Sequence, residues 1–458
     1  MTEIDLSKRS IAIFGTGVTG LSVARFLSAR NLSFVFVDSR ESPPALSELL
    51  STYPDVSIHT GPFKNSILDN IDLIVLSPGI SQEEPVLVEA GDRGIEIFGD
   101  LTLFYAVAAA PVVGITGSNG KSTVTSLVGE MASASGLNVG VGGNLGTPML
   151  DLLNEERQLY ILELSSFQLE TVVNSNATVA ALLNISADHM DRYASMDEYV
   201  RAKRRIFNGA DVGVINRQDS LTALAGIKSI VSFGLDEPKE GHFGVRRKGG
   251  SDYLCCGEQH LIAIDEIALK GAHNLANVAA AVAIGESINL PRQTMLEVLR
   301  DFNGLDHRCQ TVATINDVVF INDSKGTNVG ATIAAIASFG SSQRENIILI
   351  AGGQGKDQDF GALKHTVSGF VKLCILFGED ANQIYRSLHS VAPVELASSL
   401  VEAVSMAKLT AEAGDTVLFS PACASFDQFS GFEERGACFA QAVLASVESA
   451  TGEMGALC

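Results

Sequence analysis

A stretch of ten residues, Gly114–Thr123, constrains the fold of this chain more than any other part of its sequence. It reads Gly-Ile-Thr-Gly-Ser-Asn-Gly-Lys-Ser-Thr; an apolar run typical of a buried strand precedes it, and apolar residues at helical spacing follow. Strand, glycine-rich turn and helix form the context of a phosphate-binding loop, where backbone amides meet anionic oxygens. Ile115 departs from the strict motif, which has glycine there. The alternative is a structural turn with an incidental lysine.

The side chains of this loop are suited to ATP. Lys121 can reach the β- and γ-phosphates, and the hydroxyl of Ser122 or Thr123 can bind Mg²⁺. Downstream, Glu163 ends a strand-like run, where its carboxylate can bind the Mg²⁺ that bridges the phosphates or can remain solvated. We expect the loop to contact ATP through Gly114, Gly117, Ser118, Asn119, Gly120, Lys121, Ser122 and Thr123.

The length and composition of the chain set its class. Strand-like and helix-like stretches alternate over 458 residues, so we expect an α/β fold of three domains, at 1–99, 100–304 and 305–458. A net charge of −21 disfavours nucleic acid and anionic membranes as partners. Seven scattered cysteines, with no export signal and no membrane span, favour a reducing, cytoplasmic location. We further expect a monomer.

The first hundred residues carry a dinucleotide-binding pattern. A strand at 10–14 leads into Gly15-Thr-Gly-Val-Thr-Gly20 and a helix from Leu21, and a second strand ends at Asp38. Alone, this pattern would favour a dehydrogenase, but the second phosphate loop at Gly114 favours a nucleotide-linked substrate here and ATP there. A third strand ends in a sharp turn that is a binding turn or a structural one. The expected contacts are Gly15, Thr16, Gly17, Val18, Thr19, Asp38, Ser39, Ser77, Pro78 and Gly79.

Polar residues are dense in the middle of the chain, directly after a predicted buried strand at 178–185. His189 could bind a second cation or a phosphate, or it could be a structural histidine. The helix predicted at 199–207 includes Lys203, which would ordinarily be a solvated surface lysine.

Three predicted strands in the last third of the chain end in polar residues. The strands and their polar residues are 318–322 with Asp323, Lys325 and Thr327, the run from Ile347 with Lys356, and the run from Thr416 with Ser425. Helices are expected from about Val329 and directly after the third strand. Three such strand ends could bind a small dicarboxylate. Helix capping is the alternative for Thr327 and Ser425, and a solvated side chain is the alternative for Lys356.

In their order along the chain, these motifs resemble those of the Mur ligase family, the ATP-dependent amide-forming ligases of peptidoglycan synthesis. The resemblance covers essentially the full chain and is greatest to the branch that adds D-glutamate to UDP-N-acetylmuramoyl-L-alanine. The segments that carry it are 116–123, Glu163-Leu-Ser-Ser, 184–193, Lys203, Gly271-Ala-His-Asn-Leu-Ala-Asn277 and Gly304-Leu-Asp-His-Arg308.

The resemblance implies an architecture and a reaction. A Rossmann-like N-terminal domain would bind the UDP substrate, a P-loop-type central domain ATP, and a Rossmann-like C-terminal domain D-glutamate. The L-alanyl carboxylate would become an acyl phosphate, which the amine of D-glutamate would then attack, with two Mg²⁺ ions present. Closure of the last domain would bring residues onto ATP and exclude water.

The resemblance also implies roles for single residues. Lys121, Asn144, His189 and Lys203 would be catalytic, and Asn144 would also contact the UDP substrate. Lys203 would be N-carbamylated, which turns its cation into a carboxylate. The remaining implied residues are Ser122, Glu163, His189 and Lys203 for metal, Asn274, Asn277, Arg308, Asp323 and Lys325 for ATP, and Thr327, Lys356, Ser425 and Phe432 for D-glutamate. Phe426 stands where the D-glutamate branch usually has leucine.

Two other functions remain open at this point. One is a related ligase with another amino acid or a folate-like substrate, which an assay of phosphate release with each amino acid would separate. The other is a nucleotide-binding protein or a dehydrogenase, which would show a nicotinamide absorbance change without ATP turnover.

Overall fold

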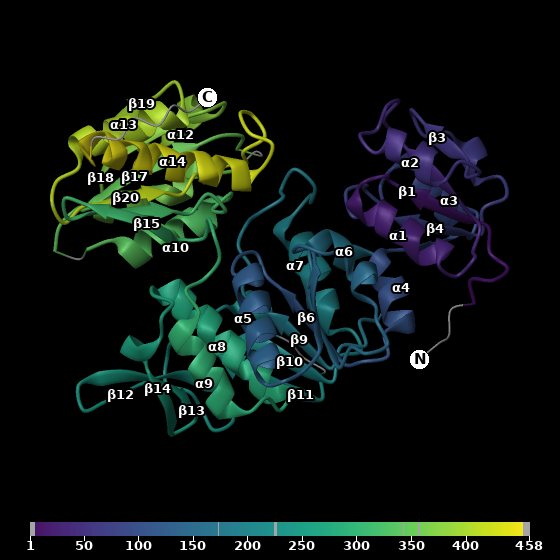
Figure 1. The fold of residues 1–458 in the computed structure, drawn as a ribbon, viewed down its shortest axis with the longest axis horizontal. Helices are drawn as coiled ribbons and strands as arrows, with labels where there is room; N and C mark the ends of the chain where they lie inside the picture. Colours follow the sequence, from purple (N-terminus) through teal and green to yellow (C-terminus); the bar gives the residue numbers. More distant parts are fainter. Residues whose placement is uncertain (1–4, 173, 224–226, 342, 356–357, 452–458) are drawn as a thin grey trace. The chain divides into compact units, whose positions relative to one another are not determined.

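The computed structural model describes residues 5–172, 174–223, 227–341, 343–355 and 358–451. Its strands form three sheets flanked by helices (Figure 1), which confirms the predicted α/β class. By internal contacts the chain divides into two compact units. The first unit comprises Met1–Ile185, Asp197–Ile267 and Ala276–Asp301, and the second comprises Ser186–Met196, Ala268–Leu275 and Phe302–Cys458.

The first sheet has five parallel strands in the order β3-β2-β1-β4-β5. Its strands are β1 (Ile11–Phe14), β2 (Phe34–Asp38), β3 (Ile58–Thr60), β4 (Leu73–Leu76) and β5 (Glu96–Phe98), and its helices are α1 (Val18–Ser28), α2 (Leu46–Thr52), α3 (Pro85–Asp92) and α4 (Asp100–Val107). Because the strands are parallel, the loops that follow them share one edge of the sheet, where ligands bind in open α/β folds.

Two glycines allow the turn from β1 into α1. Gly15 has φ +94°, and a Cβ on Gly20 would lie 1.9 Å from the Gly15 carbonyl oxygen. The helix starts at Val18, three positions before the predicted Leu21. Because Gly20 has no side chain, the first turn of the helix can pack directly against the Gly15 carbonyl.

The second sheet, also in the first unit, has nine strands in the order β14-β13-β12-β11-β10-β9-β6-β8-β7. Its strands are β6 (Val112–Thr116), β7 (Val139–Gly143), β8 (Leu159–Glu163), β9 (Val179–Leu182), β10 (Val212–Asn216), β11 (Ser229–Phe233), β12 (Phe243–Lys248), β13 (Ser251–Cys256) and β14 (Gln259–Ala263). The helices of this part of the chain are α5 (Lys121–Ala134), α6 (Ser166–Glu170), α7 (Met196–Arg204), α8 (Ala272–Ser287) and α9 (Arg292–Asp301).

One edge of this second sheet is antiparallel. Strands β12 and β13 form a hairpin whose turn consists of Gly249 and Gly250, with φ +60° and +92°. Left-handed conformation at both turn residues matches the twist of paired strands. A Cβ added at either glycine would meet no atom within 4 Å, so the turn projects into open space.

The third sheet belongs to the second unit and has six strands in the order β15-β16-β20-β17-β18-β19, with only β15 antiparallel to its neighbour. Its strands are β15 (Gln310–Ile315), β16 (Val318–Asn322), β17 (Ile347–Gly352), β18 (Val371–Phe377), β19 (Val394–Leu396) and β20 (Thr416–Phe419), and its helices are α10 (Val329–Phe339), α11 (Lys364–Phe370), α12 (Ala381–Leu388), α13 (Leu400–Thr410) and α14 (Phe432–Thr451).

Both faces of this third sheet are covered, because its strands alternate between two apolar clusters. In β17, Ile347 and Leu349 pack with residues of α10, α11 and α12, whereas Ile348 and Ile350 pack with residues of α13 and α14. The polar residues after the strands are therefore left for the edge of the sheet.

The helix predicted directly after the third strand was wrong in position. Residues after β20 form turns in which the Ser425 carbonyl accepts from the amides of Gln428 and Phe429, and α14 begins only at Phe432, after Gly431. Among the described residues, no helix is both long and apolar enough to span a membrane.

Candidate active site

The glycine-rich loop joins β6 to α5, which confirms the predicted strand, turn and helix. Gly120 has φ +80°, and a Cβ there would lie 2.3 Å from Asn277 Oδ1. Lys121 begins the helix, and its Nζ donates to the carbonyl oxygens of Gly117 at 2.9 Å and Ser118 at 3.0 Å. The ammonium group therefore lies over the loop, where a phosphate-binding lysine is needed.

Asn184, two residues after the end of β9, fixes the same loop. Its Oδ1 accepts from the Asn119 amide at 2.8 Å, and its Nδ2 donates to the Asn119 carbonyl at 3.0 Å. The Asn184 carbonyl accepts from the Ser118 amide at 2.9 Å. Asn184 belongs to the 184–193 segment of the family resemblance, which implies no role for it; these bonds make it a structural support of the loop.

Glu163, at the end of β8, brings two further site residues together. Its Oε2 accepts from Ser122 Oγ in a short hydrogen bond, and its Oε1 accepts from Asn144 Nδ2 at 2.7 Å. The carboxylate is 3% exposed, so it is not the solvated strand-end acid of the alternative interpretation. Carboxylate and hydroxyl oxygens are ligands that Mg²⁺ accepts, and the donor set fits that ion.

Lys203, on α7, is only 1% exposed, which excludes a solvated surface lysine. Its Nζ donates to the Gly117 carbonyl at 2.8 Å and lies 4.7 Å from the centroid of the Tyr199 ring. The Tyr199 hydroxyl is in turn 3.0 Å from Ser118 Oγ. The α7 helix thus packs its lysine and tyrosine against the phosphate loop.

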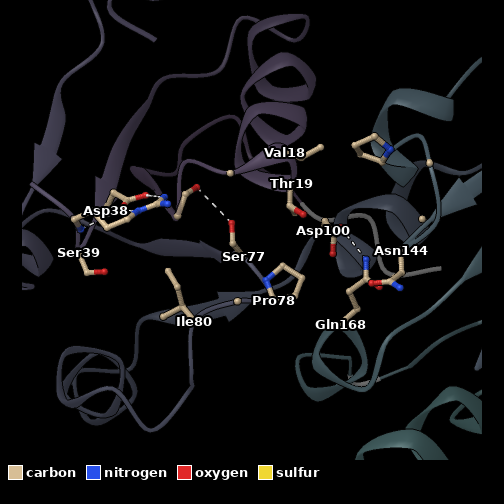
Figure 2. Close-up of a pocket in the computed structure, with 17 residues that line it drawn as sticks. Val18, Thr19, Asp38, Ser39, Ser77, Pro78, Ile80, Asp100, Asn144 and Gln168 are labelled. Carbon is tan, nitrogen blue, oxygen red and sulfur yellow. Dashed lines mark hydrogen bonds and ion pairs between the residues drawn. The ribbon is translucent and has the colours of Figure 1, made fainter. Parts of the chain in front are cut away.

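A cavity of about 610 Å³ lies in the first unit (Figure 2). Every residue expected to contact the UDP substrate, except Thr16, lines this cavity. These residues are Gly15, Gly17, Val18, Thr19, Asp38, Ser39, Ser77, Pro78, Gly79 and Asn144. The turns after β1, β2 and β4 and the residue after β7 therefore converge on one pocket.

Asp38 organises the glycine turn of this pocket. Its Oδ2 accepts from the amide of Thr16 at 3.0 Å and from Thr16 Oγ1 at 2.6 Å, and its side chain forms an ion pair with Arg40 at 2.7 Å. Burial opposes ionisation, but the hydrogen bonds from Arg40 and Thr16 outweigh it and hold the pKa of Asp38 well below its usual range. Arg40, which also lines the pocket, was not predicted; an arginine two positions after a strand-end acid was the available signal.

Asp100 and Gln168 also line the pocket and were not predicted (Figure 2). Gln168 Nε2 donates to Asp100 Oδ2 at 3.4 Å, while its Oε1 accepts from the amide and hydroxyl of Ser165. Burial raises the pKa of Asp100 to about 6. No sequence signal marked Asp100, because it stands among apolar helix residues.

In the second unit, the loop after β16 holds two expected ATP residues. Asp323 accepts from the Cys309 amide at 3.2 Å and from Ser420 Oγ at 2.7 Å, and burial raises its pKa to about 6. Lys325 Nζ lies 3.9 Å from the centroid of the Phe432 ring, so this expected D-glutamate residue is its neighbour.

Other predicted residues of the second unit have the following places. Arg308 lies between His307 and Cys309, with φ +62° and +48°, and Asn274 Nδ2 donates to the Lys270 carbonyl at 2.8 Å. The cap of α10 is Asn328, whose side chain accepts from the Ala331 amide, and not Thr327. Ser425 is 2% exposed and the adjacent Phe426 is 71% exposed, whereas Lys356 lies outside the described residues.

His189 also belongs to the second unit, within the segment Ser186–Met196. It has φ +57°, and its Nε2 lies 3.6 Å from Asp188 Oδ2. That carboxylate oxygen also accepts from Asn328 Nδ2 at 3.1 Å. The histidine is therefore held by its own loop in a conformation that few side chains adopt.

Within the described parts of the chain, no group of three or more His, Cys, Asp and Glu residues could hold a metal ion. The Mg²⁺ site expected at Ser122 and Glu163 does not need such a group, because it combines a hydroxyl, one carboxylate and oxygens that phosphate would supply. Glu163 and Ser122 are the members of that set that the structure brings into contact.

The fold and these residues define a class: an α/β protein whose chain carries two glycine turns of the phosphate-binding type, each at the carboxyl end of a parallel strand. Models of the MurD-like N-terminal domain, the Mur ligase middle domain and the Mur ligase glutamate ligase domain match residues 9–99, 115–285 and 307–423. The chain belongs to the Mur ligase family.

Curated relatives match nearly the full chain. It is 46% identical over 433 residues to a UDP-N-acetylmuramoylalanine--D-glutamate ligase of Pseudomonas fluorescens, covering 94% of this chain and 97% of the relative. A ligase of the same name from Legionella pneumophila is 46% identical over 438 residues, covering 94% and 98%.

Solved structures share the fold. MurF of Acinetobacter baumannii matches with a TM-score of 0.60 and 18% identity, over 94% of this chain and 90% of that one. The UDP-N-acetylmuramate-alanine ligase MurC of Thermotoga maritima matches with a TM-score of 0.58 and 18% identity, over 96% and 100%. At such identity these matches support the three-sheet architecture alone.

Proposed function

We propose that this chain joins the amine of D-glutamate to the L-alanyl carboxylate of UDP-N-acetylmuramoyl-L-alanine, with conversion of ATP to ADP and phosphate, in peptidoglycan precursor synthesis. The 46% identity to relatives that bear the D-glutamate ligase name, over 94% of the chain, supports this substrate pair. Within the site, the main support for the proposal is that the Glu163 carboxylate accepts hydrogen bonds from both Ser122 of the phosphate loop and Asn144 of the pocket.

The reaction would proceed in two steps. A carboxylate oxygen of the substrate attacks the γ-phosphorus of ATP, the bond to the ADP oxygen breaks, and an acyl phosphate forms. The D-glutamate amine then attacks the acyl carbon, orthophosphate leaves, and the amine loses a proton. Because the first step brings two anions together, the site must neutralise charge. Lys121 and the amides of Gly117–Gly120 would do so at the phosphates.

We propose that Ser122 and Glu163 hold one Mg²⁺ and that His189 and carbamylated Lys203 help to hold a second. When bound, Mg²⁺ would withdraw charge from the transferred phosphoryl group. Asn144 would hold the reacting carboxylate next to Glu163. No protein nucleophile is required.

The remaining assignments are proposals of the same kind. Residues 1–99 would bind the UDP group, 100–304 would bind ATP and 305–458 would bind D-glutamate. Asn274, Asn277, Arg308, Asp323 and Lys325 would complete the ATP site, and Thr327, Lys356, Ser425 and Phe432 would bind D-glutamate. We place the reaction in the cytoplasm, because it consumes ATP, and expect a monomer.

Release of orthophosphate with each candidate amino acid, in the presence of ATP, Mg²⁺ and the UDP substrate, tests this function. We expect release with D-glutamate, little with L-lysine or L-glutamate, and none after Lys121→Ala. Preference for another amino acid would overturn the substrate. Turnover that survives Lys121→Ala would overturn the role of the loop.

A further inference from the structure

Arg435, on α14, is 0% exposed and is the largest of the fully buried side chains that the structure describes. An arginine is rarely buried so completely, because its charge must leave water. It follows Glu433 and Glu434, both exposed, so the sequence shows only a run of charges. Hydrogen bonds within the protein must therefore replace the water that its guanidinium would otherwise bind.

The guanidinium donates four hydrogen bonds to residues of two loops. Its Nε donates to Ser324 Oγ at 3.1 Å, and one terminal nitrogen donates to the Ser324 carbonyl at 2.8 Å. The terminal nitrogens also donate to the carbonyls of Ala424 at 3.0 Å and Cys423 at 3.1 Å. The planar fork therefore bridges the loop after β16 and the loop after β20.

A third loop is attached to this bridge. The Ala424 carbonyl, which accepts from Arg435, also accepts from the Gln354 amide at 3.0 Å, and the Ala424 amide donates back to Gln354 at 2.8 Å. Gln354 follows β17. Because β16, β20 and β17 are neighbours in the sheet, one side chain connects the loops at three adjacent strand ends.

Among the residues that the structure describes, Arg435 forms no ion pair with a carboxylate. Its four acceptors are three carbonyl oxygens and a hydroxyl. Burial lowers the pKa of Arg435 to about 10, so the group remains a cation at neutral pH. A lysine could supply the charge, but its single nitrogen cannot span both loops as the fork does.

These loops carry residues of the proposed site. Lys325 and Thr327 follow Ser324, and Ser425 follows Ala424. We propose that Arg435 is a positioning residue for the amino-acid site, whose guanidinium fork holds the loop of Lys325 and Thr327 in register with the loop of Ser425. The identification of D-glutamate as the ligand of these loops rests on the proposed function.

Two other contacts join the loops and should preserve the fold when the fork is lost. The Ala422 amide donates to the Gly326 carbonyl at 2.8 Å, and Ser420 Oγ donates to Asp323 at 2.7 Å. The conservative variant Arg435→Lys should therefore fold, while its loops become less ordered.

The test compares Arg435→Lys with Arg386→Lys, a matched control at an exposed arginine on α12 of the same unit. We expect Arg435→Lys to raise KM for D-glutamate at least about tenfold and KM for the UDP substrate less than about twofold. Hydrogen exchange at the amides of Gln354, Ala422 and Ala424 should accelerate only in Arg435→Lys. An unchanged KM for D-glutamate with unchanged exchange would overturn the proposal.

Ser324→Ala provides a second variant if Arg435→Lys does not fold. It removes the hydroxyl acceptor of Nε and leaves the arginine in place. We expect a smaller rise in KM for D-glutamate and faster exchange at the same amides; no change in either overturns the proposal. If the unaltered protein releases no phosphate with D-glutamate, the proposed function fails, and the exchange rates still decide whether Arg435 orders the loops.

Discussion

Lys203 Nζ lies 2.8 Å from the carbonyl oxygen of Gly117, the same oxygen to which Lys121 Nζ donates at 2.9 Å. Two ammonium groups that share one acceptor repel each other. Converting the Lys203 amine into a carbamate would exchange this repulsion for attraction. The structure thus provides a physical reason for the modification that the family resemblance implies at Lys203.

Lys203→Ala should lower kcat by at least about 100-fold, because it removes both the buried amine and the carboxylate that it would become. Short carboxylates such as acetate should restore part of the activity by entering the vacated space. Initial rates with and without acetate measure both effects, with Lys248→Ala, at an exposed lysine of β12, as control. Full activity of Lys203→Ala without acetate would show that the lysine has no part in turnover.

Gly120→Ala should destabilise the protein and raise KM for ATP. A Cβ would meet Asn277 Oδ1 at 2.3 Å, and alanine resists φ +80°. We expect a loss of about 2–4 kcal/mol in the free energy of unfolding. Gly136→Ala is the matched control, because Gly136 has φ +84° but no atom within 4 Å of a Cβ, and should cost about 1 kcal/mol. Denaturant unfolding of both variants measures the difference, and equal losses would rule out the clash.

Asp38→Asn should raise KM for the UDP substrate about tenfold without a comparable change in KM for ATP. An amide in place of the carboxylate turns an N–H toward the Thr16 or Arg40 donors, so the glycine turn loses its support. Steady-state kinetics measure both constants, with Asp55→Asn at an exposed position as the control. Parallel rises in both KM values would contradict a local role for Asp38.

Asp100→Asn should stabilise the protein at neutral pH more than in acid. Burial raises the pKa of Asp100 from 3.8 to about 6, so the folded state binds a proton that the unfolded state releases between these values. Stability of the unaltered protein therefore falls as pH rises through this window, by up to about 3 kcal/mol from this group. Thermal unfolding near pH 4.5 and pH 7.5 should show the larger gain in Tm at the higher pH. An equal gain at both would show that Asp100 does not titrate in this range.

Local pattern predicted the framework and most of the residues that line the pocket of the first unit. Helix α10 begins at Val329 as expected, since Asn328 caps it. Glu163 contacts Ser122 because β8, which ends at Glu163, is the parallel neighbour of β6, which leads into the loop before Ser122. Burial could not be predicted in the same way. Lys203 and Arg435 each lie in charged helical segments of the kind usually exposed to solvent. Only packing against loops distant in sequence buries them.

Asp100 illustrates the same limit. Its carboxylate is buried by residues that the chain supplies far downstream, so periodicity within α4 carries no sign of it. Similarly, α14 starts later than predicted because the residues after β20 make turns around Ser425 instead of continuing into a helix.

The Gly249–Gly250 turn between β12 and β13 offers an experimental handle. It caps an antiparallel hairpin at the margin of the nine-stranded sheet, at least four strands from β6, and a Cβ added at either glycine would meet no atom within 4 Å. A fluorophore or a short epitope inserted there would leave the catalytic loops untouched. Labelled enzyme could then report substrate-dependent motion in solution without loss of turnover.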